Sequence, residues 1–170
     1  MMKSKHLALL GALACALSSC CYHLGGLKPG NMKNMNTFCV EMFENNTVQP
    51  NVGMLMTTAI TNTLQSDGTY RLATRDKADF ILKGTVTEIH RDSLRTNPDD
   101  TYVSSEIGLR VHVFYQIIDN KTGKTLMENE TNAQGSYFNQ GVNTVSAMDT
   151  ALSYATRLLA ENITLNLTSS

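Results

Sequence analysis

Every second residue from Ile107 to Ile117 is apolar in "EIGLRVHVFYQIID", residues 106–119. Side chains at every second position of a strand lie on the same face, so this pattern predicts a long strand with one buried face. The apolar face requires a covering layer, because a single strand cannot bury it. The residues of that face are Ile107, Leu109, Val111, Val113, Tyr115 and Ile117.

Two other segments repeat apolar residues at helical spacing and could form that layer. Residues three and four apart lie on one face of a helix, so each segment predicts a helix with a single apolar stripe. The first stripe, which "SDG" at residues 66–68 should end, comprises Val52, Leu55, Met56, Ala59, Ile60, Thr63 and Leu64. The second comprises Val145, Met148, Leu152, Ala155, Leu159 and Ile163.

Further strands are expected on both sides of the first helix. "TFCVEMF" at residues 37–43 alternates, and a short strand is expected at residues 70–73. "ADFILKGTVTEIHR", residues 78–91, predicts a longer strand. Its alternation slips at Glu88 and Ile89, which indicates a bulge or strong twist near Thr87.

The remaining segments predict connections and one more strand. "SLRTNPDDTYV", residues 93–103, is interpreted as a polar loop. "DNKTGK", residues 119–124, predicts a hairpin connection in which Gly123 can adopt a positive φ. A strand is expected at residues 125–138.

These elements predict an α/β two-layer sandwich, with a mixed, mostly antiparallel sheet of four to five strands and two helices packed on one face. The long strands joined by hairpins should be antiparallel. The first strand, which is followed by a helix crossover, should lie parallel to a neighbour.

The N-terminus reads as a signal peptide. Basic residues precede the uncharged run "LALLGALACAL" at residues 7–17, which is too short to cross a membrane. The sequence Leu17-Ser18-Ser19-Cys20 then resembles the bacterial lipobox, which implies a diacylglycerol and an N-acyl chain on Cys20. Cys15 and Cys21 fit this motif less well, because Ala12 and Ser18 occupy their aliphatic positions.

Several acyl chains on one residue anchor a protein stably without a transmembrane helix. The residue after Cys20 is not Asp, which by analogy with bacterial sorting signals favours the periplasmic side of the outer membrane. We therefore expect a lipoprotein signal peptide at residues 1–19, a lipidated N-terminus and extended tether at residues 20–36, and one α/β domain at residues 37–167.

The remaining cysteines leave two possibilities open. Cys21 and Cys39 could form a disulfide in an oxidising periplasm, or Cys39 could be a small apolar residue in a strand. No cofactor other than the acyl chains is expected, and no metal, because His23, His90 and His112 lack zinc-type spacing with either cysteine.

Charge and motifs favour neither a nucleic-acid-binding protein nor an enzyme. Without residues 1–19, 12 of the 14 basic residues remain against 15 acidic ones, which gives a net charge of −3. The remaining chain therefore lacks the excess of positive charge that is typical of nucleic-acid-binding proteins. The sequence contains no G-x-S-x-G, Walker or H-E-x-x-H motif. His112 is interpreted as a surface or packing histidine.

Three stretches of the chain together resemble the LptE family, the lipopolysaccharide-assembly lipoproteins of the outer membrane. They are "CCYHLGG", "FCVEMFENNTVQPNVGMLMTTAITNTL" and "ADFILKGTVTEIHRDSL". The resemblance implies a hetero-complex with the LptD-like β-barrel that inserts lipopolysaccharide into the outer leaflet, with this domain as a plug. Many members carry Gly where this chain has Cys21.

A second family class shares the Ala-Asp-x-x-Leu-x-Gly pattern of "ADFILKG". It consists of outer-membrane lipoproteins that reach across the periplasm to regulate peptidoglycan synthases. Those proteins usually have a long disordered tether, whereas about fifteen residues are available here, which favours the assembly factor.

Contact with lipopolysaccharide requires cations, because the ligand presents phosphates and sugar acids. Arg91 and Arg95 are the candidate contacts for lipopolysaccharide or the barrel, since they flank the turn out of a long strand, in a loop that should project from the sheet. Lys83 and Arg110 could extend a basic strip. Alternatively, all four are ordinary solvated charges, partly neutralised by residues such as Asp92, Asp99 and Asp100.

Overall fold

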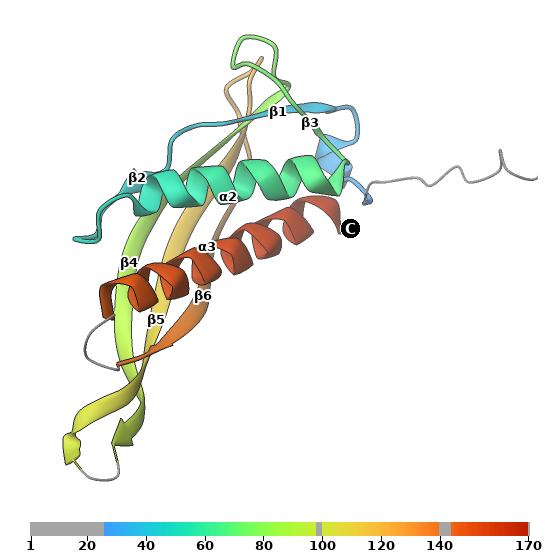
Figure 1. The fold of residues 1–170 in the computed structure, drawn as a ribbon. Helices are drawn as coiled ribbons and strands as arrows, with labels where there is room; N and C mark the ends of the chain where they lie inside the picture. Colours follow the sequence, from blue (N-terminus) through green and yellow to red (C-terminus); the bar gives the residue numbers. More distant parts are fainter. Residues whose placement is uncertain (1–25, 98–99, 140–143, 170) are drawn as a thin grey trace, which may run out of the picture.

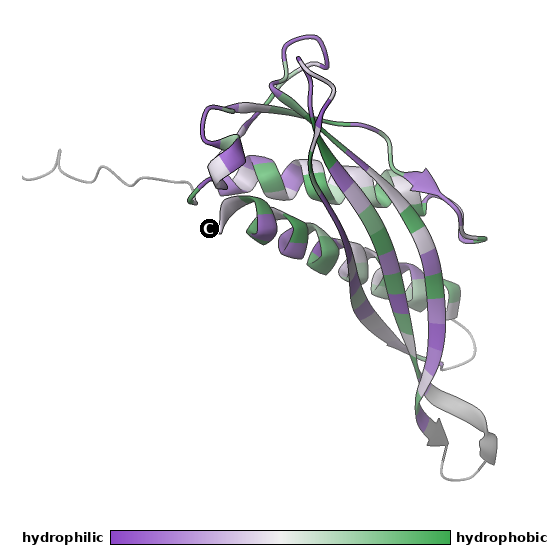
Figure 2. Ribbon diagram, turned by 180° about the vertical axis from the view of Figure 1, so that it is seen from behind, coloured by the Kyte–Doolittle hydropathy of each residue, from purple (hydrophilic) through white to green (hydrophobic). Residues whose placement is uncertain are grey.

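The computed structural model describes residues 26–97, 100–139 and 144–169, without the side chains of residues 96–97 and 100–105. One layer is a six-stranded sheet in the order β3-β1-β4-β5-β6, with β2 paired to β4. Two helices, α2 and α3, lie side by side across one face of the sheet and leave the other face open (Figures 1 and 2). The predicted two-layer α/β sandwich is confirmed.

These elements follow one another along the chain in the expected order. The bounds are η1 (Gly30–Met32, a 3-10 turn), β1 (Thr37–Val40), β2 (Glu44–Asn45), α2 (Val52–Asp67), β3 (Arg71–Leu72), β4 (Phe80–Asn97), β5 (Asp100–Asp119), β6 (Thr125–Phe138) and α3 (Thr144–Thr168). As predicted, β1 is parallel to its neighbours β3 and β4, and the long strands β4, β5 and β6 are antiparallel.

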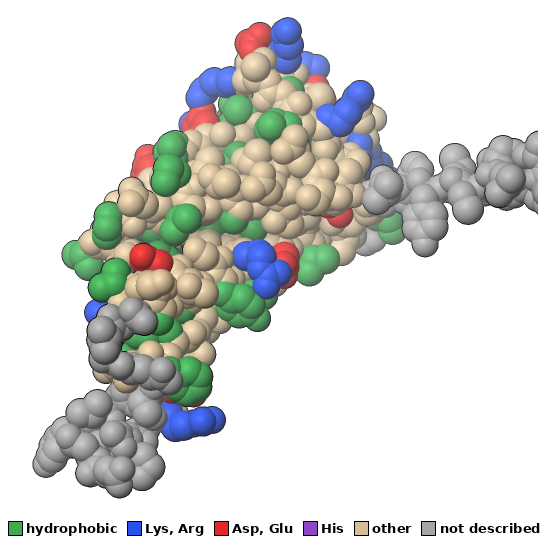
Figure 3. All heavy atoms as spheres, viewed as in Figure 1, with side chains coloured by type: hydrophobic (Ala, Val, Ile, Leu, Met, Phe, Trp, Pro, Cys, Tyr) green, Lys and Arg blue, Asp and Glu red, His purple; other side chains and the backbone are tan. Residues whose placement is uncertain are grey.

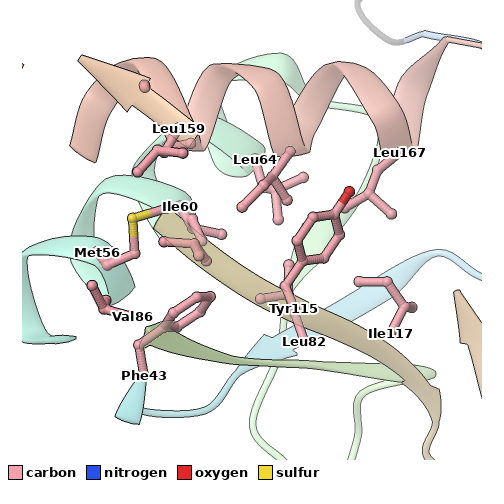
Figure 4. Close-up of a cluster of buried hydrophobic side chains, with 14 of the residues drawn as sticks. Phe43, Met56, Ile60, Leu64, Leu82, Val86, Tyr115, Ile117, Leu159 and Leu167 are labelled. Atoms are coloured by element: carbon pink, nitrogen blue, oxygen red, sulfur yellow. The ribbon is translucent and has the colours of Figure 1, made fainter. Parts of the chain in front are cut away.

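The core lies between the sheet and the two helices, and most of it comes from the stripes read in the sequence. Fully buried residues face one another across the layers (Figure 4). They include Phe38, Met56, Ile60, Leu64, Phe80, Leu82, Val86, Val111, Tyr115, Ile117, Leu159 and Ile163. The hairpin between β5 and β6 also follows prediction, since Gly123 has a φ of 70°.

Two predicted elements are wrong in detail. The strand expected at residues 37–43 is split into β1 and β2, because the alternation breaks after Val40. Met42 is exposed while Phe43 is buried, where its ring occupies the space left by Gly84. The loop expected at residues 93–103 is instead the far end of a β4–β5 ribbon that extends beyond both helices (Figure 1).

Part of the predicted tether is also not extended, because it packs on the domain. Met32 in η1 is fully buried in the core. The Gly26 N–H donates a 2.6 Å hydrogen bond to Thr69 Oγ1, and Gly26 lies against Thr168 at the end of α3. We call this end of the molecule, where both helices end and the N-terminal segment docks, the tethered end.

Ionisable groups stabilise the tethered end. Oδ2 of Asp79 accepts hydrogen bonds from the N–H groups of Asn36 and Thr37 and from the Thr37 hydroxyl, and these bonds lower the pKa of the Asp79 carboxyl. Burial, helped by the charge of Asp67, raises the pKa of Tyr70 to about 12. The Tyr70 hydroxyl donates to the Leu167 carbonyl at 3.1 Å.

Candidate functional site

A groove of about 440 Å³ lies at the opposite end of the molecule, where both helices begin. Its walls are the loop between β2 and α2, the middle of β4, Leu109 of β5 and the first turns of α3. Exposed apolar side chains gather around this end (Figure 3). Val48 in the β2–α2 loop, Met54 in the first turn of α2 and Val145 in the first turn of α3 are all exposed. We call this end the groove end. The lining residues are Asn46, Thr47, Val48, Gln49, Thr87, Glu88, Ile89, His90, Arg91, Leu109, Met148 and Leu152.

A bulge in β4 determines which side chains enter the groove. Val86 lies opposite Val113 of β5, but the next pairs are Glu88 with His112 and Ile89 with Val111, so Thr87 is the extra residue. This confirms the bulge predicted near Thr87. Because the alternation changes phase there, Ile89 and Arg91 turn toward the helices instead of away from them.

Arg91 is therefore a cation in a groove that five apolar side chains line together with polar ones. One of its guanidinium nitrogens lies 3.3 Å from the Met148 sulfur on α3. Within the described part of the chain, no carboxylate lies within 4.0 Å of Arg91. A thioether is a weak acceptor that carries no charge, so the charge of Arg91 remains available for a ligand.

Arg95 does not join Arg91 in one site. A second irregularity between Ser93 and Arg95 turns Arg95 to the open face of the sheet, opposite Glu106 of β5. Its Nε lies 3.7 Å from the Glu106 carboxylate. The expectation that both arginines occupy a projecting loop is wrong, because both belong to β4.

Lys83 and Arg110 both lie on the open face, and both are paired with acids. Lys83 Nζ is 3.2 Å from Glu41, which also contacts Arg75. Arg110 lies 3.3 Å from Asp92, the neutralising partner suggested by the sequence. Exposed ion pairs of this kind are worth about 0–1 kcal/mol and leave little free charge. Asp99 lies outside the described residues, and the side chain of Asp100 is not described.

Most of the residues that β4 and β5 direct to the open face are polar. His112 is on this face, as the sequence predicted, with its ring centroid 5.7 Å from that of His90. His90 Nε2 in turn lies 2.8 Å from Glu88. Among the described residues, no three His, Cys, Asp or Glu side chains lie together in a way that could hold a metal ion.

The groove itself was not predicted from the sequence, because its walls come from four segments that are distant in sequence. The only local signal is Val48, an apolar residue within the polar turn "ENNTVQPNVG". The proposed lipidation site Cys20, and Cys21, which could form a disulfide with Cys39, lie outside the described residues. Within the described part, no helix has the length and hydropathy of a membrane span.

Solved structures with the same fold include proteins from several bacteria. Protein XCC0632 from Xanthomonas campestris aligns with a TM-score of 0.60 at 9% identity, covering 86% of this chain and 87% of that chain. The PelC dodecamer from Paraburkholderia phytofirmans aligns with a TM-score of 0.54 at 18% identity, covering 86% of this chain and 94% of that chain. Rare lipoprotein B from Shewanella oneidensis aligns with a TM-score of 0.51 at 13% identity, covering 77% of this chain and 92% of that chain. At these identities, the similarities establish the fold alone.

No curated protein sequence matches the chain. The family model described as LptE, lipopolysaccharide-assembly, matches residues 35–167, which comprise nearly all of the described fold and include the groove. The chain therefore belongs to the LptE family of lipopolysaccharide-assembly proteins.

Proposed function

We propose that this protein is an outer-membrane lipoprotein, anchored by acyl chains on Cys20, that partners the LptD-like β-barrel of lipopolysaccharide transport. As a plug and assembly factor, it helps to place lipopolysaccharide in the outer leaflet. The observation that carries this proposal is the short distance in sequence between the proposed anchor and the first residue held by the fold.

Only six residue steps separate Cys20 from Gly26, whose N–H is bonded to Thr69. Six residues span at most about 20 Å when fully extended. A lipid on Cys20 therefore holds the tethered end next to the bilayer. Such a domain can meet a partner in the same membrane, whereas a regulator of peptidoglycan synthases has to reach across the periplasm.

The open face of the sheet suits a position inside a barrel. The interior of a large transmembrane barrel is polar, so a plug has to present polar side chains to it. Lys83, His90, Asp92, Arg110 and Gln116 lie on the open face of this sheet. The paired charges reduce the cost of removing this face from bulk water.

Arg91 is the better of the two candidate contacts for lipopolysaccharide or the barrel. Its guanidinium suits a phosphate or carboxylate, and the apolar groove beside it accepts an uncharged group. Arg95 is the weaker candidate, because Glu106 already accompanies it.

Metabolic labelling with a palmitate analogue tests the anchor. The wild-type protein should be labelled and should fractionate with the outer membrane, and Cys20→Ser should abolish labelling. Cys21→Ser is the matched control, since it removes the neighbouring thiol. Loss of label in Cys21→Ser but not in Cys20→Ser would show that the wrong cysteine was chosen.

Affinity purification from detergent-extracted outer membranes tests the partner. We expect recovery of the LptD-like barrel in an amount equal to that of this protein. Recovery of a penicillin-binding protein instead would favour the alternative function, regulation of peptidoglycan synthases.

Lipopolysaccharide binding to a soluble chain that starts at residue 22 tests the role of Arg91. Weaker binding by Arg91→Glu, with unchanged binding by Arg95→Glu and an unchanged melting temperature, would make Arg91 a lipopolysaccharide contact. Unchanged binding by both variants would leave Arg91 as a contact with the barrel.

A further inference from the structure

Among the described residues, one edge of β4 has no partner strand beside the groove. On this edge β1 pairs with residues 80–82 of β4, and β2 pairs with Thr85 and Val86. The last backbone bond runs from the Asn46 N–H to the Val86 carbonyl, at 3.0 Å. In the described part of the chain, no backbone group then bonds to this edge from Thr87 to Asp92, although β5 pairs with the other edge throughout.

The open edge and the groove involve the same residues. Along a strand, the side-chain direction and the direction of the N–H and C=O groups both alternate with a period of two. Val86 turns its side chain into the core and its carbonyl toward Asn46. Across the bulge the phase is kept by β5, because Val113, Val111 and Leu109, which lie opposite Val86, Ile89 and Arg91, are two residues apart. Ile89 and Arg91 therefore also direct their side chains inward, into the groove, and their backbone groups toward the open edge.

These features restrict what can occupy the groove. An acyl chain could cover Ile89, Leu109 and Leu152, but it would leave the donors and acceptors of the β4 edge unpaired. An extended peptide satisfies the apolar side chains of the groove and the backbone groups of the β4 edge together, because its backbone pairs with the edge while every second side chain enters the groove. Arg91, which has no carboxylate partner in the described part of the chain, adds a preference for an acidic side chain.

We propose that the groove end binds an extended segment of a partner protein, which adds to the free edge of β4 as a further strand. The segment continues the line of β2, inserts alternate apolar side chains into the groove and places one Asp or Glu against Arg91. The proposal rests on the proposed function only in treating the groove as a contact site. The test below requires neither lipopolysaccharide nor a barrel, so either proposal can fail without the other.

The test uses the full mature lipoprotein in detergent and a set of synthetic nonapeptides. Threonine occupies their outward positions and valine their inward positions, and a glutamate replaces each inward valine in turn. Binding is measured by fluorescence anisotropy, and hydrogen exchange of the segment 86–92 is followed by mass spectrometry. We expect at least one glutamate peptide to bind and to slow exchange of this segment at least tenfold.

Variants and modified peptides identify the mode of binding. Arg91→Glu should weaken binding of the glutamate peptide at least tenfold. A peptide with lysine in place of that glutamate should restore binding to the Arg91→Glu variant. Arg110→Glu makes the same charge change on the open face and should leave binding unchanged. N-methylation of the peptide backbone on the bonding edge, which removes donors but keeps the side chains, should abolish binding.

Three results would overturn the proposal. In one, no peptide of the set slows exchange of residues 86–92 at millimolar concentration. In another, the N-methylated peptide binds as well as the unmodified one. In the third, lauric acid, a probe for acyl chains, binds in the groove while no peptide does, which would assign the groove to lipid.

Discussion

The tethered end and the groove end are formed by the same long strands and the same two helices, yet they differ in packing. Toward the tethered end, the helices cover the sheet over a continuous core with fully buried residues such as Phe80, Leu82 and Tyr115. At the groove end, a separate small cluster holds only Leu109, Tyr137 and Ala151 as buried members.

The difference follows from where the helices begin. Both start at the groove end, so β4 continues past α2 with one edge open and its inward face only partly covered. Regions used for binding commonly come from the less stable parts of a fold, because their exposed surface is not satisfied internally. Stability therefore comes mainly from the tethered end, and the groove end is the region that we propose as the contact with a partner.

Truncation of the core should produce the largest effect. Phe80→Ala removes a fully buried ring that packs against Phe38 and Tyr70, so we expect a loss of about 3–5 kcal/mol in the free energy of unfolding. Met148→Ala at the groove should cost about 1 kcal/mol or less, because its side chain is only partly buried. Urea unfolding measures both, and equal losses would contradict the comparison.

The next effect tests the close approach of α3 to the sheet. A Cβ on Gly135 would lie 2.1 Å from the Ala151 carbonyl oxygen, so Gly135→Ala has to displace the backbone of α3. We expect a loss of about 1–3 kcal/mol. Gly30→Ala is the control, since a Cβ there meets no atom within 4 Å, and it should change stability by less than about 0.5 kcal/mol.

High pH should weaken the tethered end through Tyr70. The folded-state pKa, about 12, lies above the unfolded value near 10, so the neutral phenol is favoured by folding. The stabilisation is complete below pH 10 and is lost as the pH rises toward 12. Urea titrations at several pH values should show this decline in the free energy of unfolding. Tyr70→Phe should remove the part of the decline that comes from ionisation of Tyr70. A decline of the same size in Tyr70→Phe would exclude Tyr70 as its cause.

Arg91→Glu should have the smallest effect on stability. The described part of the chain provides no ion pair for Arg91, so the change should alter the free energy of unfolding by no more than about 0.5 kcal/mol. Thermal unfolding checks this expectation. A loss comparable to that of Gly135→Ala would mean that Arg91 serves the fold and not a partner.

The sequence predicted those elements whose burial is periodic. The alternation from Ile107 to Ile117, the two helical stripes and the bulge at Thr87 all reflect a sheet with one covered face. The β4–β5 ribbon beyond residue 93 was misread as a loop because a ribbon outside the helical layer needs no apolar face. Its strands satisfy each other's backbone groups, which leaves no pattern in the side chains.

The candidate site was less predictable than the fold. Arg91 was selected for its charge, but its separation from Arg95 depends on two irregularities in β4, of which the sequence indicated only the first. The groove depends on the distance between the β2–α2 loop and the start of α3, and residues so distant in sequence carry no common pattern. The open edge of β4 results from the two-residue length of β2.

Site-specific photo-crosslinking in living cells tests the central claim, that the groove end meets a partner in the outer membrane, most directly. Val48 is fully exposed at the rim of the groove, so a photoreactive residue there should not disturb the fold. We predict an adduct with an outer-membrane β-barrel protein that weakens when Arg91→Glu is added. The absence of an adduct, or an adduct with a penicillin-binding protein, would contradict the claim.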